Sequence, residues 1–158
     1  MKNVPFWPML IGTGFGSGFC PMAPGTAGAL LATIIWAALV GLFPYIWVVH
    51  ITFALVIIFT ILGIWAANRL ETCWGEDPSR VVVDEMVGVW IPLLVVPADN
   101  LWYYGIAAFV LFRLFDIFKP LGIRKMEDLP GGIGVMMDDI LSGIYALLIL
   151  LLVRYWLG

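Results

Sequence analysis

Three polar segments interrupt an otherwise apolar chain and divide it into runs long enough to cross a membrane. The polar segments are Gly12–Thr26, Asn68–Glu85 and Arg113–Asp139. A helix needs about 20 apolar residues to cross the hydrocarbon core, and Pro92 should kink or stop one run. We therefore expect about five hydrophobic helices, preceded by a short interfacial helix at Pro5–Ile11. Their expected ranges are 27–43, 45–67, 81–96, 101–118 and 140–156.

Composition supports this interpretation. The chain is 63% hydrophobic and only 12% charged, whereas about a quarter of the residues in a soluble domain are charged. The predicted fold class is an all-α, polytopic integral membrane bundle, with residues 1–158 forming a single domain. Irregular backbone at 12–25 and 120–137 should be buried in protein or face the membrane interface, because lipid does not satisfy its polar groups. A net charge of −3 argues against a nucleic-acid partner.

The charged residues predict the orientation. With a cytoplasmic N-terminus, the loops near 68–80 and 119–138 are cytoplasmic too, and the excess of Lys and Arg on that side follows the positive-inside rule. The opposite side would carry only Arg154 and Asp99. The basic residues assigned to the cytoplasmic side are Lys2, Arg69, Arg80, Arg113, Lys119, Arg124 and Lys125. If residues 81–96 entered and returned, everything after them would flip, and the charge count argues against that.

Five carboxylates lie near span ends that should meet: Asp84, Glu85, Asp116, Asp138 and Asp139. Asp84 and Glu85 should fall in the second turn of a helix that opens near Pro78, and adjacent acids at a membrane boundary are costly unless they are paired or bound to metal. Asp138 and Asp139 should begin the last span, where acids also suit the helix dipole. The alternatives are a water-solvated pair for the first two acids and dipole partners for the last two.

Two further features suit phosphate. The glycine-rich segment before the first span carries Thr13, Ser17 and Thr26, and Thr26 is a candidate helix N-cap. Arg113, Asp116 and Lys119 are spaced three apart, so they share one helical face. The first feature could instead be a tightly packed turn, and the second a simple salt-bridge ladder.

The sequence excludes most other kinds of catalytic site. Hard oxygen ligands of this kind suit Mg²⁺, which binds a few carboxylates together with water and substrate phosphate. His50 is the single histidine and lies in an apolar run on the other side, which excludes a Ser/His/Asp triad. Cys20 and Cys73 form no CxxC pair. Metal-assisted phosphoryl chemistry remains.

Three blocks carry a resemblance to a known family. GTGFGSGFCPMAPGTAG, VVDEMVGVW and FRLFDIFKPLGIRKMEDLPGGIGVMMDDILSG resemble the signature blocks of the phosphatidylglycerophosphatase A family. The resemblance implies a Mg²⁺-dependent lipid phosphatase of the bacterial inner membrane. Such an enzyme hydrolyses phosphatidylglycerophosphate to phosphatidylglycerol and inorganic phosphate, which is the last step in making that lipid.

The resulting hypothesis assigns a role to each group. The five carboxylates are expected to hold Mg²⁺ and to orient or deprotonate water, while Arg113 and Lys119 neutralise phosphate oxygens. The phosphate-binding site is completed by Thr13, Ser17 and Thr26. Direct attack by water is favoured over a phospho-aspartate intermediate, and phosphate–water oxygen exchange would separate the two. The substrate enters from the lipid bilayer on the cytoplasmic side, and the sequence carries no signal for oligomeric state.

Three other functions compete with this hypothesis. A CDP-alcohol-type headgroup transferase also uses Mg²⁺, but its D-x-x-D-G-x-x-A-R run is missing, and the segment from Asp116 to Lys119 does not supply it. An ion-coupled transporter subunit would be expected to carry its carboxylates at mid-span. A non-catalytic membrane scaffold would leave the clustered acids unexplained.

Overall fold

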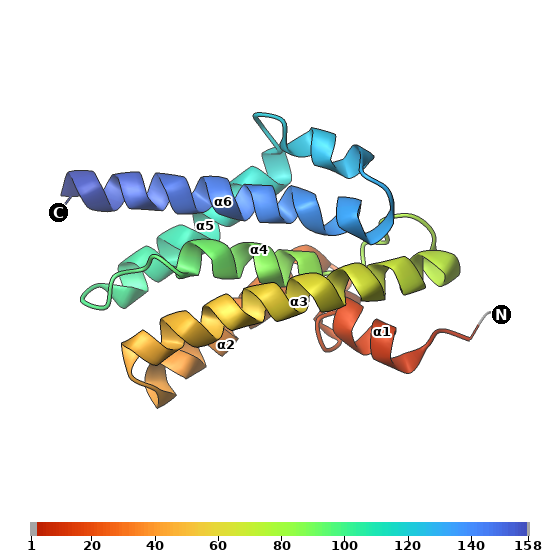
Figure 1. Cartoon of the computed structure of the whole chain (residues 1–158), viewed down its shortest axis with the longest axis horizontal. Coiled ribbons are helices and arrows are strands. Elements are labelled where there is room, and N and C mark those ends of the chain that lie inside the picture. The colour runs from red at the N-terminus through yellow and green to blue at the C-terminus, as the bar shows by residue number, and fades with distance from the viewer. Residues whose placement is uncertain (1–2, 158) are drawn as a thin grey trace.

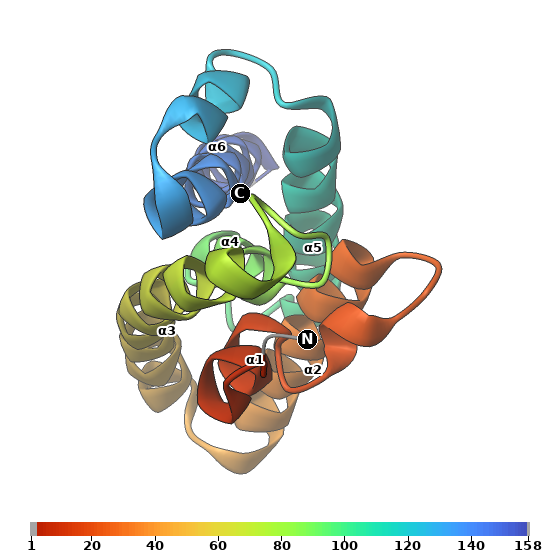
Figure 2. The same cartoon turned by 90° about the vertical axis from the view of Figure 1, so that its right-hand side faces the viewer.

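The protein is a bundle of helices in the computed structural model, which describes residues 3–157 (Figures 1 and 2). Four helices are long and apolar enough to cross a membrane: α2 (Pro24–Leu42), α3 (Tyr45–Trp74), α5 (Leu101–Phe118) and α6 (Gly131–Leu157). The shorter elements are α1 (Phe6–Gly12), α4 (Val83–Leu93) and the 3₁₀ helices η1 (Ser17–Phe19) and η2 (Ile123–Asp128). The predicted class, an all-α polytopic membrane protein, is confirmed.

Helix α4 lies at the centre of the bundle, enclosed by the longer helices (Figure 2). Every α4 residue except Glu85 is buried, as expected for a helix that is apolar around most of its circumference. Its 11 residues give a length of about 16 Å, which is roughly half of the hydrocarbon core. The span expected at 81–96 is therefore a half-length helix, with Pro92 in its last turn, and the chain continues without helix to Asn100.

Glycines let α4 approach its neighbours closely. A Cβ atom on Gly143 of α6 would overlap the carbonyl oxygen of Gly88 in α4, and a Cβ on Gly88 would overlap the ring of Phe112 in α5. Small residues at such contacts allow helix backbones to pack tightly inside a membrane. This packing brings the middle of α4 against the middle of α6, and the start of α4 next to Asp139.

The ends of α3 and α6 differ from the sequence expectation. Helix α3 continues to Trp74 instead of ending near residue 67, and α6 begins at Gly131 instead of near residue 140. Asn68 Oδ1 accepts a hydrogen bond of 2.6 Å from the Gly132 amide, so the extended end of α3 holds the start of α6. The placement of Asp138 and Asp139 at a helix N-terminus was wrong. Both lie well inside α6, where the dipole effect of the first turn does not act.

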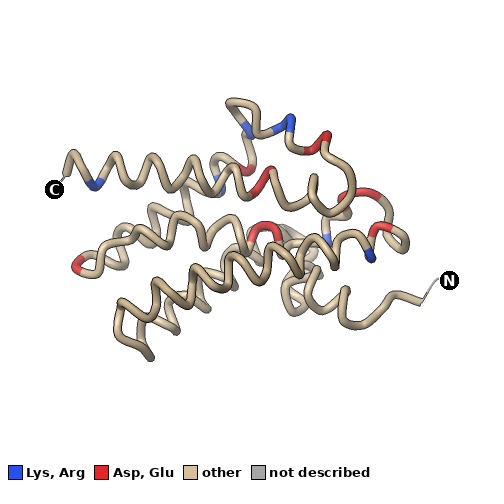
Figure 3. The backbone as a smooth tube through the Cα atoms, in the orientation of Figure 1, with Lys and Arg blue, Asp and Glu red and all other residues tan. Residues whose placement is uncertain are grey.

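The two ends of the bundle differ in charge. The loops at 75–82 and 119–130 lie toward the same end of the bundle, as the sequence predicts (Figure 1). Asp99 and Arg154 lie together at the opposite end, where Arg154 donates to Val95 O. Among the described residues, most of the other charges gather toward the loop-bearing end and the middle of the bundle (Figure 3). Lys2, which was counted with the basic residues of that end, lies outside the described residues.

Candidate active site

A cavity of about 370 Å³ is formed where the first turns of α2 and α4, the end of α5 and the second and third turns of α6 come together. All five predicted carboxylates line it, as do three of the predicted substrate-binding residues. These eight residues are Thr26, Asp84, Glu85, Arg113, Asp116, Lys119, Asp138 and Asp139. Residues from three separate polar segments thus share one cavity.

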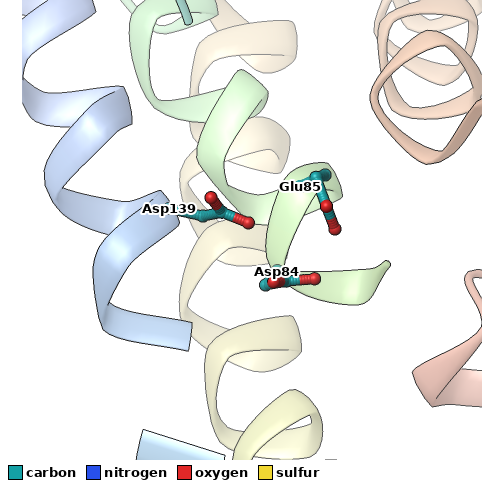
Figure 4. Close-up of side chains that lie close together, drawn as sticks. All are labelled: Asp84, Glu85 and Asp139. Carbon is teal, nitrogen blue, oxygen red and sulfur yellow. The ribbon is translucent and has the colours of Figure 1, made fainter. Parts of the chain in front are cut away.

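Three of the carboxylates converge more closely than the rest. One ligand oxygen from each of Asp84, Glu85 and Asp139 lies within 4.8 Å of the other two. Asp139 points from α6 toward Asp84 and Glu85, which lie in the first turn of α4 (Figure 4). They were expected in the second turn, but the helix begins at Val83 and not near Pro78.

The environment of these three carboxylates suits a bound positive charge. Asp84 Oδ1, Glu85 Oε2 and Asp139 Oδ1 are buried and accept no hydrogen bond from the described residues. Carboxylates this close repel one another and are costly to bury without a counter-charge. A buried set of oxygen ligands with free lone pairs fits a hard divalent cation such as Mg²⁺.

The other two carboxylates each have a basic partner. Asp116 is ion-paired with Arg113, and Arg113 Nη2 donates to Thr26 Oγ1 at 3.2 Å. Lys119 Nζ lies 2.6 Å from Asp138 Oδ2. The basic residues therefore sit beside the three converging carboxylates, in a position to meet the oxygens of a bound phosphate.

Lys119 does not follow the face predicted for it. It caps α5 in the left-handed conformation, with φ of 49°, and it turns toward α6 instead of Asp116. Burial lowers the pKa of Lys119, but its hydrogen bonds to Asp138 and Glu127 raise that pKa above its ordinary value overall. The side chain is therefore a permanent cation at the cavity.

Two acidic residues at this site were not predicted from the sequence. Glu127 of η2 accepts a hydrogen bond of 2.6 Å from Lys119 Nζ. Asp77 lines the cavity, and burial raises its pKa above the usual range, aided by the negative charges of Glu127 and Asp116. Asp77 has φ of 42°, a backbone conformation that Asp tolerates better than most residues. Its only signal in the sequence was an acid next to Pro78.

Thr13 and Ser17 do not line this cavity. Thr13 is buried and donates to Met9 O at 2.7 Å, and Ser17 donates to Gly14 O at 2.8 Å. Their glycine-rich segment packs against the chain just before α4: a Cβ on Gly18 would overlap the carbonyl of Arg80. This arrangement matches the packed-turn alternative for that segment.

Thr26 reaches the cavity, but not as a helix cap. Helix α2 begins at Pro24 with Ala23 at the N-cap position, so Thr26 lies in the first turn and its hydroxyl is free to accept from Arg113. A Cβ on the neighbouring Gly25 would lie 2.6 Å from Glu85 Oε1. Glycine at this position therefore lets Glu85 approach the start of α2.

The family model and two of the similar proteins carry the same family name. The model of the family described as phosphatidylglycerophosphatase A matches residues 10–154. A Bacteroides thetaiotaomicron protein provisionally named phosphatidylinositol-3-phosphatase is 65% identical over the whole of both chains. The phosphatidylglycerophosphatase A of Haemophilus influenzae is 38% identical over 94% of this chain and 89% of its own. That of Escherichia coli is 36% identical over 85% and 76%, respectively. No solved structure matches.

Proposed function

The chain belongs to the phosphatidylglycerophosphatase A family, and on this premise we propose that it is a Mg²⁺-dependent phosphatidylglycerophosphatase. It hydrolyses the terminal phosphomonoester of phosphatidylglycerophosphate and releases phosphatidylglycerol and inorganic phosphate. The reaction completes phosphatidylglycerol synthesis. The observation that carries the proposal is the set of three carboxylates, Asp84, Glu85 and Asp139, whose oxygens converge within 4.8 Å and which each hold one buried oxygen that accepts no hydrogen bond from the described residues.

These three residues would hold the metal. A bound Mg²⁺ would polarise a phosphoryl oxygen and balance the charge of the carboxylates. The ligand set contains only oxygen, which favours Mg²⁺ over softer metals. Asp116 and Asp138 line the same cavity, each beside a basic partner, and they are the candidate proton acceptors for an incoming water.

The basic residues bind the phosphate. Arg113 and Lys119 line the cavity next to the carboxylates, and they stabilise the negative charge that shifts to the leaving glycerol oxygen as the P–O bond breaks. The first turn of α2 brings the positive end of that helix to the cavity wall at Gly25 and Thr26. Water attacks phosphorus on the side opposite the leaving oxygen, and a carboxylate orients the water and removes its proton.

We place this chemistry at the cytoplasmic face of the inner membrane. The described Lys and Arg residues, apart from Arg154 at the far end of α6, belong to segments on the side of the site, as the positive-inside rule requires of a cytoplasmic side. A phosphorylated headgroup is too polar to cross the hydrocarbon core unaided. The substrate pool is therefore that of the cytoplasmic leaflet.

A second substrate follows from the name of the 65% identical relative. Phosphatidylinositol 3-phosphate is also a phosphomonoester carried on a glycerophospholipid headgroup, so the same carboxylates and basic residues would serve it. It presents an inositol ring where phosphatidylglycerophosphate presents a flexible glycerol. A cavity of about 370 Å³ lies in the lower part of the usual range for small-molecule sites, which favours the smaller headgroup.

One assay tests the proposal. The purified protein in detergent micelles is given phosphatidylglycerophosphate or phosphatidylinositol 3-phosphate, with Mg²⁺ or with EDTA, and phosphate release is measured. We expect Mg²⁺-dependent release from phosphatidylglycerophosphate and a lower kcat/KM for the inositol lipid. Full activity in a metal-stripped sample would contradict the metal role. Preference for the inositol lipid would assign the site to the second substrate.

A further inference from the structure

An apolar groove runs between α2 and α5 directly below the proposed active site. It has a volume of about 190 Å³, smaller than the roughly 300 Å³ at which compact small-molecule pockets begin, so it suits a slim ligand. Its lining includes Leu30, Thr33, Trp36, Ala37, Ile106 and Phe109. Thr33 Oγ1 donates to Ala29 O at 2.9 Å within α2, so its hydroxyl hydrogen is already bonded inside the helix.

The groove begins one helical turn away from the active-site cavity. The hydrogen bond from Arg113 to Thr26 joins α5 to α2 at the cavity wall. One turn further along each helix lie Phe109 and Leu30, which begin the groove. Because α2 and α5 run in opposite directions, each further turn adds one lining residue from each helix. A molecule whose phosphate meets Arg113 therefore has the groove directly beneath its headgroup.

The length and openness of the groove fit a lipid tail. From Leu30 to Ala37 the groove follows about two turns of α2, or about 10 Å, which is about two thirds of the roughly 15 Å of hydrocarbon in one leaflet. Leu30 and Ile106 are 50% and 65% exposed, so the groove opens sideways to the bilayer. Trp36 is buried at its floor, and a Cβ on Gly105 would lie only 3.3 Å from the Trp36 ring.

We propose that this groove binds one acyl chain of the phosphomonoester lipid whose headgroup occupies the active site. The proposal rests on the function proposed above. Lipid tails are as apolar as the groove, so moving a chain from bilayer to groove yields little affinity. The gain is orientation: a tail held between α2 and α5 fixes the depth and the angle at which the phosphate meets the carboxylates. Ala37, at the far end, limits the chain length that fits.

Filling the far end tests this proposal. Ala37→Trp should block the last turn of the groove, and Ala38→Trp is the matched control, because Ala38 is exposed and does not line the groove. For Ala37→Trp we expect about a tenfold or greater loss of kcat/KM on dipalmitoyl phosphatidylglycerophosphate, since misplacement of a reacting group has at least that effect. Activity on the dihexanoyl substrate should be unchanged, and Ala38→Trp should match the wild type on both lipids.

The activities on the two lipids distinguish a failure of the groove proposal from a failure of the proposed function. If the wild type hydrolyses both chain lengths and Ala37→Trp does so equally well, the groove proposal is wrong and the phosphatase assignment stands. Equal losses on both substrates would also overturn it, because a folding defect or a disturbed active site does not depend on chain length. If the wild type releases no phosphate from either lipid, the proposed function itself fails.

Photo-crosslinking tests acyl-chain binding in the wild-type protein, and it does not depend on catalytic turnover. A phosphatidylglycerophosphate with a diazirine near the end of one acyl chain should label peptides from residues 30–37 and 102–109, and excess unlabelled substrate should compete. A phosphatidylcholine carrying the same diazirine should not label these peptides above the other lipid-facing helices. Equal labelling by both lipids would mean that bulk lipid fills the groove, and the proposal would be wrong.

Discussion

Lys119 Nζ lies 2.6 Å from Asp138 Oδ2, and this ion pair connects the end of α5 with the interior of α6. The same ammonium group donates to Glu127 Oε1, also at 2.6 Å. The Asp138 and Lys119 side chains are 7% and 20% exposed, so solvent screens the pair only partly. One cation thus holds η2 and α6 together beside the three converging carboxylates.

Removing this cation should affect folding and catalysis separately. Lys119→Met leaves Asp138 buried without a partner, and breaking a buried pair costs about 3 kcal/mol, which thermal unfolding in detergent would detect as a lower Tm. Lys119→Met combined with Asp138→Asn should recover most of this stability, because no buried charge is left unpaired. Activity should stay low in both variants. A double variant that is as unstable as Lys119→Met would show that the pair is not the source of the loss.

Neutralising the cavity carboxylates should abolish turnover without unfolding the protein. We expect Asp84→Asn, Asp138→Asn and Asp139→Asn each to lower kcat/KM by at least about 10²-fold, the lower limit for loss of an acid–base group. Asp99→Asn, at the opposite end of the bundle, is the control and should keep wild-type activity. Near-wild-type rates in all three cavity variants would exclude this site.

Metal binding should be visible as stabilisation. A ligand present at 100 times its Kd stabilises a fold by about 2.7 kcal/mol, so Mg²⁺ should raise the Tm of the EDTA-treated protein in detergent. Glu85→Gln and Asp139→Asn each remove one of the three converging carboxylates and should reduce the shift. An equal Mg²⁺ response in these variants and in the wild type would place the ion elsewhere.

The close approach of α4 to its neighbours should make Gly88 intolerant of a side chain. Gly88→Ala would press a methyl group into the Phe112 ring and to 2.9 Å from Asp139 O, and overpacking of this kind costs about 1–3 kcal/mol. Gly41→Ala is the matched control, because no atom lies within 4 Å of a Cβ there and Ala is the better helix former. Thermal unfolding should show a lower Tm only for Gly88→Ala.

The side of the membrane on which the site lies can be read from single cysteines. In a background lacking Cys20 and Cys73, cysteines at positions 76 and 127 should resist an impermeant thiol reagent in intact cells and react in inverted vesicles. A cysteine at position 100 should do the reverse. Labelling of position 127 from outside the cell would contradict the positive-inside assignment.

The sequence by itself determined the class of protein and the grouping of its polar residues. Uncharged runs such as Ala27–Ala67 have to be helical in lipid, because a helix satisfies its own backbone polar groups. The order of the spans then places the loops near 75–82 and 119–130 at the same end, as Figure 1 shows. These conclusions depend on run length and local composition, which need no knowledge of packing.

Only the tertiary structure decided which of the polar residues at the site contact one another and where each helix ends. Helix α6 begins at Gly131 because Asn68, from a different helix, binds the Gly132 amide. Asp84 and Glu85 lie side by side in the chain, yet it is the glycine-mediated contact of α4 with α6 that brings Asp139 to them. Contacts of this kind join residues far apart in sequence, so their geometry follows from the packing of whole helices and not from the pattern within any one segment.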